Sequence, residues 1–128
     1  MTSSCIDILL AEDDEDLRDA MVETLNEAGY TVEAVGNGRD AIEWLEDTAH
    51  PPKLILLDLM MPVMDGWQFL EERQKTPKAA DLPVVVFSAA GSFAAGNEAV
   101  MFMRKPIAVK PLLVIVARYC TAIPELPS

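Results

Sequence analysis

The clearest pattern in the chain is a series of short apolar runs, each closed by a polar residue. Residues 54–58 read Leu-Ile-Leu-Leu-Asp, and the turn-forming residues Pro62 and Gly66 follow shortly afterwards. An apolar run without polar alternation is typical of a strand that is buried on both faces. The same pattern predicts strands at residues 7–11, 31–35, 54–59, 84–88 and 100–104.

Between these runs, apolar residues recur at the spacing of an α-helix. Leu17, Met21 and Leu25 recur at the period of one helix face, and Gly29 supplies the stop that glycine gives at a helix C-terminus. The acidic residues 12–16 precede this helix. Further helices are predicted at residues 39–47, 66–75 and 109–120.

Strands that alternate with helices predict an α/β domain with one five-stranded parallel sheet and helices on both faces. The commonest such arrangement is flavodoxin-like, with strand order 2-1-3-4-5 and a crevice between the first and third strands. The 128 residues suffice for a single domain. We expect its core at about residues 6–120 and a loose tail at residues 121–128.

One interval is shorter than this fold normally requires. Residues 89–99 comprise only 11 residues between the fourth and fifth strands, whereas a parallel crossover takes about a dozen or more. Two glycines lie within this interval. We therefore expect the fourth helix to be shortened to at most two turns or replaced by an irregular connector.

Charge and composition exclude several classes of function. Ten basic residues against 21 acidic ones give a formal charge of −11, which disfavours direct contact with nucleic acid or anionic membranes. The two cysteines form no metal-binding or disulfide pattern, and no apolar run approaches the ~20 residues that span a membrane. The N-terminus lacks the pattern of a signal peptide. These features predict a cytoplasmic protein without membrane insertion.

Polar side chains stand at the carboxyl ends of four predicted strands, where ligands bind in open α/β sheets. Three carboxylates at about 5 Å from one another would repel by roughly 3 kcal/mol per pair at an effective dielectric constant of about 20. Bound Mg²⁺ would relieve that repulsion. A cation, a lysine and a hydroxyl around one carboxylate make a phosphoryl-transfer site in which Asp58 is the nucleophile. The residues concerned are Glu12, Asp13, Asp58, Ser88 and Lys105.

Each of these residues also has an ordinary structural interpretation. Asp14, Glu15 and Asp16 are equally consistent with capping the first helix and favouring its dipole. Ser88 or Lys105 alone would indicate nothing. Only the joint placement on four strand ends favours the phosphoryl-transfer site.

The chain resembles a response-regulator receiver domain of two-component signalling, similar to the chemotaxis regulators. Four segments carry the resemblance, which extends over roughly residues 6–120. They are Ile-Leu-Leu-Ala-Glu-Asp-Asp-Glu-Asp-Leu-Arg (8–18), Leu-Leu-Asp-Leu-Met-Met-Pro-Val-Met-Asp-Gly (56–66), Val-Phe-Ser-Ala (86–89) and Arg-Lys-Pro (104–106). The segment around Asp58 is the specific one, whereas the last two are weak alone.

The resemblance implies a role for each residue of the predicted site. Asp58 would accept a phosphoryl group from a phosphohistidine on a sensor kinase or phosphotransfer protein, and a downstream protein target would respond. Such a domain catalyses only its own phosphorylation and dephosphorylation. Mg²⁺ would be held by Asp13 directly, by Glu12 through water, and by Asp58 and the backbone carbonyl of Met60.

The resemblance also implies a switch. Ser88 would be its hydroxyl, Lys105 the phosphate partner, and Phe102 the aromatic residue that changes position. In such domains the peptide bond between the lysine and the following proline, here Lys105-Pro106, is usually cis. The short segment 89–99 departs from the family pattern, which places the output face partly on the fourth helix.

Two other functions fit the same fold. An aspartate-nucleophile phosphatase of the haloacid-dehalogenase type would need a second aspartate two residues after Asp58, where this chain has Met60. A flavodoxin-like cofactor binder would need a phosphate-cradling loop after the first strand, where residues 12–14 are all acidic and would repel a phosphate.

Overall fold

A computed structural model describes residues 5–89 and 101–120 of the chain. Strands and helices alternate through the first three units, and the fifth strand leads into the last helix. The elements are β1 (Ile8–Ala11), α1 (Glu15–Glu27), β2 (Val32–Val35), α2 (Gly38–Asp47), β3 (Leu54–Asp58), α3 (Gly66–Arg73), β4 (Val84–Ser88), β5 (Met101–Arg104) and α4 (Val109–Cys120).

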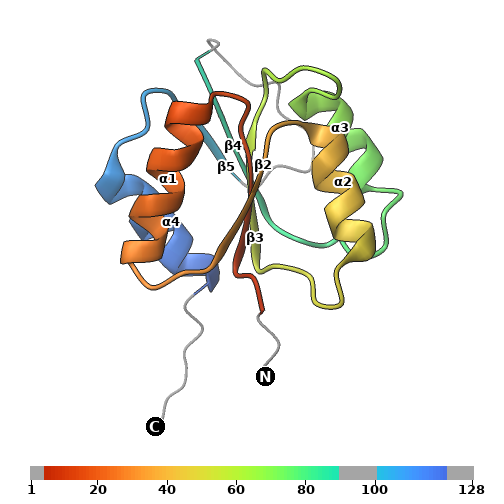
Figure 1. Cartoon of the computed structure of the whole chain (residues 1–128), viewed down its shortest axis with the longest axis horizontal. Helices are drawn as coiled ribbons and strands as arrows, with labels where there is room; N and C mark the ends of the chain where they lie inside the picture. The colour runs from red at the N-terminus through yellow and green to blue at the C-terminus, as the bar shows by residue number, and fades with distance from the viewer. Residues whose placement is uncertain (1–4, 90–100, 121–128) are drawn as a thin grey trace, which may run out of the picture.

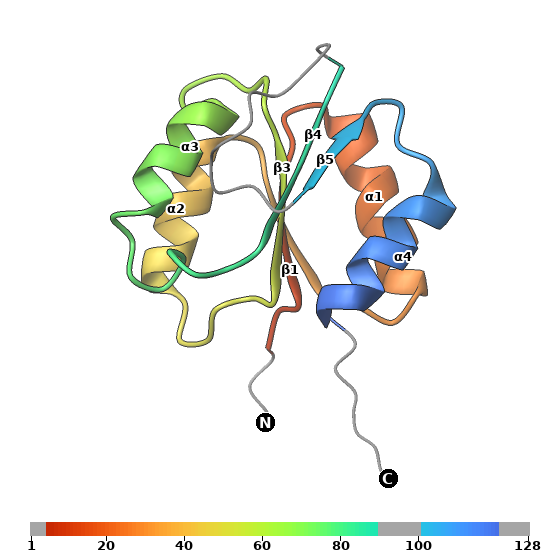
Figure 2. The same cartoon turned by 180° about the vertical axis from the view of Figure 1, so that it is seen from behind.

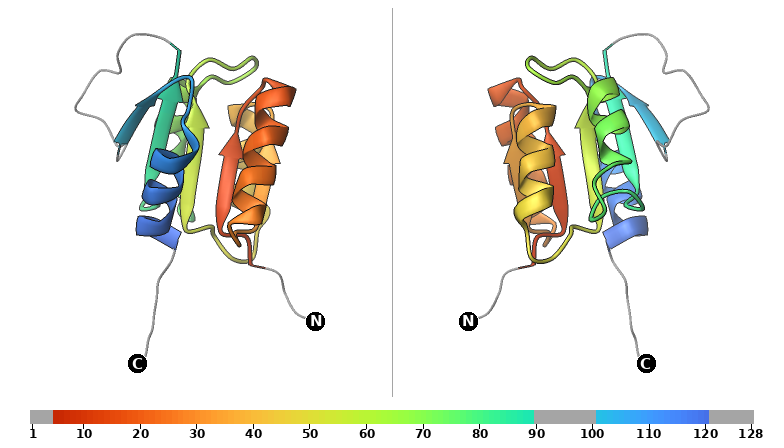
Figure 3. Two further views of the ribbon diagram at one scale, coloured as in Figure 1. Left: turned by 90° about the vertical axis from the view of Figure 1, so that its left-hand side faces the viewer. Right: turned by 90° about the vertical axis from the view of Figure 1, so that its right-hand side faces the viewer.

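The strands form one parallel sheet in the order β2-β1-β3-β4-β5, which confirms the predicted flavodoxin-like topology. Helices α1 and α4 cover one face of the sheet, and α2 and α3 cover the other (Figures 1 and 2). Seen from the side, the sheet is a middle layer whose strands all point towards the same end (Figure 3). That end carries the loops that follow β1 and β3.

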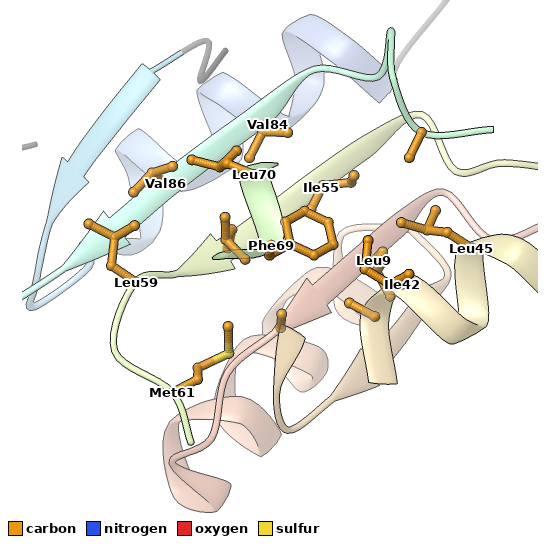
Figure 4. Close-up of a cluster of buried hydrophobic side chains, with 14 residues drawn as sticks. Leu9, Ile42, Leu45, Ile55, Leu59, Met61, Phe69, Leu70, Val84 and Val86 are labelled. Atoms are coloured by element: carbon orange, nitrogen blue, oxygen red, sulfur yellow. The ribbon is translucent and has the colours of Figure 1, made fainter. Parts of the chain in front are cut away.

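The continuous apolar runs are explained by cover on both faces. Alternate residues of a strand point to opposite faces, so Leu9 and Ala11 join one buried cluster whereas Ile8 and Leu10 join the other. The first cluster packs against Leu45 and Phe69 of α2 and α3 (Figure 4). The second packs mainly against α1 and α4. Polar residues on the central strands would be buried on either face.

The two edge strands are less buried than the central ones. Every residue of β1, β3 and β4 is buried, whereas all of β2 and most of β5 are half-buried. This difference follows from the strand order, which places β2 and β5 at the edges of the sheet.

Local capping sets where α1 begins and ends. The carboxylate of Asp14 accepts hydrogen bonds from the backbone N–H groups of Asp16 and Leu17, so this acid is the N-cap. Glu15 and Asp16 lie in the first turn, where they favour the helix dipole. Gly29 follows the helix with a φ of 101°, the left-handed conformation that ends many helices. The predicted stop is confirmed.

Close backbone approaches shape the loop between β3 and α3. A Cβ on Gly66 would lie 2.7 Å from the Cα of Leu59 and 2.8 Å from the carbonyl oxygen of Asp58. The N–H of Gly66 donates to the carbonyl of Leu59 at 2.9 Å. Glycine at this position therefore lets α3 start directly against the end of the strand that carries Asp58.

The shortened fourth helix predicted for residues 89–99 falls almost wholly on residues 90–100, which lie outside the described part of the chain. The loose tail predicted at residues 121–128 also lies outside it. Among the residues that are described, no helix combines the length and the apolar character that crossing a bilayer would require.

Gly66→Ala tests the close packing of the β3–α3 loop. We expect it to lower the free energy of unfolding by about 1–3 kcal/mol, since the added methyl group meets backbone rather than a movable side chain. Chemical denaturation measures this loss. Gly36→Ala is the matched control, because its Cβ would meet only the end of the Arg18 side chain at 3.4 Å. Equal stability of the two variants would contradict the packing described.

Candidate phosphoacceptor site

The register of the sheet brings the strand ends together. Ala11 at the end of β1 pairs with Leu57, so Glu12 and Asp58 are the next residues along adjacent strands. On the other side of β3, Asp58 pairs with Phe87, and Ser88 pairs with Arg104. Lys105 follows as the next residue after β5. The residues predicted from four separate segments therefore occupy one edge of the sheet.

Three carboxylates meet at this edge. One oxygen from each of Glu12, Asp13 and Asp58 lies within 4.8 Å of the others. Glu12 is fully buried and Asp58 is 2% exposed, whereas Asp13 faces solvent. The cluster thus has two acids inside the protein and one at its mouth, which leaves it open to solvent on one side.

Lys105 balances part of this charge. Its ammonium group lies 3.0 Å from Oε1 of Glu12 and 3.6 Å from Oδ2 of Asp58. It also lies 5.5 Å from the centre of the Phe87 ring. Because Glu12 and Asp58 come from adjacent strands, this one lysine bridges the crevice between them. The Lys105-Pro106 peptide bond is cis, as the resemblance predicted.

Glu12 also connects the site to α1. Its second oxygen, Oε2, accepts a hydrogen bond from the backbone N–H of Asp14 at 2.8 Å. Asp14 is the N-cap of α1, so the buried carboxylate and the first turn of the helix are joined through one residue. The backbone carbonyl of Glu12 in turn accepts from Arg18 at 3.0 Å.

Burial and charge act together on the ionisation of the site. Burial first, and then repulsion from Glu12, raise the pKa of Asp58 to about 6, although Lys105 and the N–H of Met60 lower it. Burial also lowers the pKa of Lys105, but the hydrogen bonds and charges of Glu12 and Asp58 outweigh this and raise it overall. The lysine therefore stays charged, and Asp58 loses its proton at a higher pH than an ordinary aspartate does.

Of the remaining predicted residues, Ser88 and Met60 form backbone hydrogen bonds with residues of the acidic site. Ser88 is fully buried at the end of β4, and its backbone carbonyl accepts from the N–H of Lys105 at 3.0 Å. The N–H of Met60 donates to Oδ1 of Asp58 at 3.3 Å, and the Met60 side chain is exposed. Phe102 is half-buried on β5 and packs against the hydrophobic cluster between the sheet and helices α2 and α3.

The donor set fits Mg²⁺. This ion prefers carboxylate oxygens and usually keeps several waters, so it needs few protein ligands and an open side. Glu12, Asp13 and Asp58 offer hard oxygen ligands within one ion's reach, and the exposed position of Asp13 leaves room for water. Repulsion among the three acids would fall when a divalent cation is bound.

The ion pair between Lys105 and Glu12 is not among the contacts predicted from the sequence. The resemblance implies a role for Lys105 at the phosphoryl group and for Glu12 at the metal, and it does not link the two side chains. Their contact depends on the reach of both side chains across the sheet edge, and neither residue type nor spacing reveals that reach. The sequence likewise left the role of Asp14 open, and the structure shows it as the helix cap.

The charge balance at Asp58 predicts a pH-dependent effect on stability. With Mg²⁺ removed by a chelator, we expect Asp58→Asn to raise the midpoint of thermal unfolding at about pH 8. The pKa of Asp58 rises from its ordinary 3.8 to about 6 on folding. The destabilisation by ionised Asp58 is therefore complete above pH 6. It decreases as the pH falls from 6 to 3.8 and is absent below 3.8, where the carboxyl is protonated in both the folded and the unfolded state.

The advantage of Asp58→Asn should accordingly shrink as the pH is lowered from 8 to 5. Asp19→Asn, which removes an exposed carboxylate of α1, serves as the control and should show a smaller change. Scanning calorimetry over this pH range makes the measurement. A variant no more stable than the parent chain at pH 8 would show that ionised Asp58 is not destabilising.

Comparison with known proteins places this geometry in a family. The family model of the response regulator receiver domain matches residues 8–117. An uncharacterized 14.6 kDa protein of Leptolyngbya boryana is 30% identical over 128 residues, covering 96% of each chain. The transcriptional regulatory protein HprR of Escherichia coli is 40% identical over 87 residues, which are 66% of this chain and 36% of HprR. The chain thus spans about a third of that longer relative.

A solved structure gives the same fold. The receiver domain of the sensor histidine kinase PA1611 from Pseudomonas aeruginosa, with a magnesium ion in its active-site cleft, superposes with a TM-score of 0.80. It is 24% identical, and the match covers 91% of this chain and 98% of that one. The family match, the full-length relative and the strand-end cluster agree, and the chain belongs to the response regulator receiver domain family.

Proposed function

We propose that this receiver domain is a phosphoacceptor that takes a phosphoryl group onto Asp58. The observation that carries the proposal is the position of Asp58 at the end of a buried strand, with the ammonium group of Lys105 3.6 Å from one carboxylate oxygen. Glu12 and Asp13 contribute two further carboxylates at the same edge of the sheet. A nucleophile, a fixed cation and a set of metal ligands meet there, which is what phosphoryl transfer requires.

The transfer step balances with a phosphohistidine as the donor. A carboxylate oxygen of Asp58 forms a bond to phosphorus while the bond from phosphorus to the imidazole nitrogen breaks. The imidazole leaves with the electron pair of that bond and takes up a proton. The product is an acyl phosphate on Asp58, and its oxygens lie where Lys105 can pair with them. Lys105 would then exchange contacts with Glu12 for contacts with the phosphoryl group.

Mg²⁺ is the cofactor that we assign to the proposed function. Asp13, Glu12, Asp58 and the carbonyl of Met60 would hold it, and when bound it would neutralise the phosphoryl oxygens as charge shifts during transfer. The magnesium ion in the cleft of the PA1611 receiver domain supports this assignment. The same acids, held together without a cation, would repel one another.

The proposed role in the cell follows from the site and from the family. A sensor histidine kinase or a phosphotransfer protein in the cytoplasm would supply the phosphoryl group. Ser88 would hydrogen-bond it, and Phe102 would change position as Ser88 and Lys105 move. A downstream protein would bind the altered surface. The domain would promote its own phosphorylation and dephosphorylation and would turn over no separate substrate.

Phosphorylation at Asp58 can be tested with a small donor. Incubation with acetyl phosphate and Mg²⁺ should add one phosphoryl group to the chain, as seen by intact-mass spectrometry. Asp58→Asn should abolish the addition because amide nitrogen and oxygen are poor nucleophiles. Asp81→Asn, which changes an exposed carboxylate of the α3–β4 connection, should be phosphorylated normally. Equal labelling of the Asp58→Asn variant would refute the assignment.

Metal binding can be tested separately from phosphorylation. We expect Asp13→Asn to weaken Mg²⁺ binding by at least about tenfold, as loss of a metal-site group commonly does. Isothermal titration calorimetry gives the affinity. Asp16→Asn, an exposed acid in the first turn of α1, is the control and should bind Mg²⁺ with the parent affinity. Similar weakening in both variants would mean that general acidity, not Asp13, attracts the ion.

A further inference from the structure

Helices α2 and α3 lie side by side on the face of the sheet away from α1 and α4 (Figure 1). Two adjoining hollows of about 260 and 210 Å³ lie between them and share Arg39, Met64 and Glu72. We call these two hollows the α2–α3 groove. A third hollow of about 620 Å³ lies beside it on α2 and β2 and is lined by no residue of α3.

Apolar side chains form the floor of the groove. Met64 is half-buried where the two hollows of the groove meet. The buried side chain of Ile42 contributes to the larger of these two hollows. Val63 lines the far end with 72% of its surface exposed and a φ of 68°. A β-branched residue seldom adopts this left-handed conformation, and here it holds an apolar side chain in solvent.

The rim of the groove is acidic. Glu43 and Glu46 stand along α2, and Glu71 and Glu72 stand along α3. Arg39 is the one cationic side chain among the residues that line the three hollows in the described part of the chain. The groove therefore combines a hydrophobic floor with a surplus of negative charge.

Nearby lysines leave most of this charge unbalanced. Lys75 pairs with Glu72 at 3.8 Å, at one side of the groove. The ammonium group of Lys78 instead donates to the backbone carbonyls of Glu46 and Thr48 at the end of α2. Glu43 and Glu46 form no ion pair with any residue that the structure describes.

The groove is also connected to the phosphoacceptor loop. Met64 lies on its floor, and the carbonyl of Met64 accepts a hydrogen bond from the N–H of Gly38 at 2.8 Å. A Cβ on Gly38 would lie 2.7 Å from that oxygen, so α2 starts in direct contact with the β3–α3 loop. The same loop begins at Asp58. A ligand on the floor of the groove would thus contact the loop that carries the phosphoacceptor.

We propose that the α2–α3 groove binds a lysine- or arginine-rich polypeptide segment that inserts an apolar side chain between the two helices. Charge complementarity selects a basic partner, and the acidic rim repels nucleic acid and anionic lipid. The apolar floor selects a polypeptide over a simple cation, because only a polypeptide offers an apolar anchor beside its charges. This binding goes beyond the proposed function and does not require phosphorylation of Asp58.

The test uses the intact chain and two synthetic peptides of equal length and charge. One contains lysine, alanine and leucine, and the other contains only lysine and alanine. The leucine peptide should bind more tightly, and backbone amide resonances of α2, α3 and the β3–α3 loop should shift in NMR spectra. Equal affinity for the two peptides, or shifts centred on α1 and α4, would overturn the proposal.

Charge reversal distinguishes the groove from the general acidity of the chain. We expect Glu43→Lys with Glu46→Lys to weaken binding of the leucine peptide by about tenfold or more, as loss of rim charge beside an apolar contact should. Glu23→Lys with Glu27→Lys makes the same change of net charge on exposed residues of α1 and should leave binding within about twofold of the parent. Equal weakening in both double variants would overturn the proposal.

Two further measurements are needed. The first tests whether a second copy of the chain occupies the groove, and the second tests whether peptide binding is independent of the proposed phosphorylation. If sedimentation shows a dimer of the free chain that Glu43→Lys with Glu46→Lys dissociates, the groove would hold a second copy and the proposal would be wrong. Asp58→Asn should bind the leucine peptide as the parent does. Failure of phosphorylation at Asp58 therefore leaves the groove proposal standing, and failure of peptide binding leaves the phosphoacceptor site standing.

Discussion

The close approach of Glu12 and Asp58 at the carboxyl ends of two adjacent buried strands is the constraint on which the rest of the site depends. Their carboxylates are held away from water by the same packing that buries β1 and β3. One ammonium group, that of Lys105, reaches both of them, at 3.0 and 3.6 Å. A single positive charge does not neutralise three acids, so a bound divalent cation would relieve the remaining repulsion.

The neighbouring loops are tied to this edge by short contacts that leave little freedom. The carboxylate of Glu12 accepts a hydrogen bond from the backbone N–H of Asp14, and Asp14 is the N-cap of α1. On the other side, Gly66 lets α3 begin against the end of β3. Through these contacts the acidic edge of the sheet is joined to helices on both of its faces. A change in charge at Asp58 would act on elements that are already in contact with it.

The negative charge of the chain is unevenly distributed among its helices. The lining of the α2–α3 groove includes four glutamates, Glu43, Glu46, Glu71 and Glu72, over an apolar floor. By contrast α4 contains no acidic residue and exposes Val114 between apolar neighbours, whereas α1 beside it is acidic. The net charge of −11 therefore gives a poor picture of what a partner would meet on either side.

The sequence by itself determined the element types, the parallel sheet and the residues at its active edge. Apolar runs such as residues 54–57, short and bounded by turn residues, indicate strands covered on both faces, and the polar residue that ends each run then emerges at one edge of a parallel sheet. Strand order followed from the handedness of crossovers and from the commonness of one topology. Boundaries were less certain, and α3 ends at Arg73, two residues before the predicted end.

Only the tertiary structure decided which side chains touch. Lys105 and Glu12 are separated by most of the chain, and β3 and β4 lie between the strands that precede them, so their ion pair depends on the reach of the side chains. The α2–α3 groove likewise arises from contacts between elements. Periodicity reports which face of an element is buried, because burial is a property of each residue. It cannot report distances between elements, because these depend on how whole helices and strands pack.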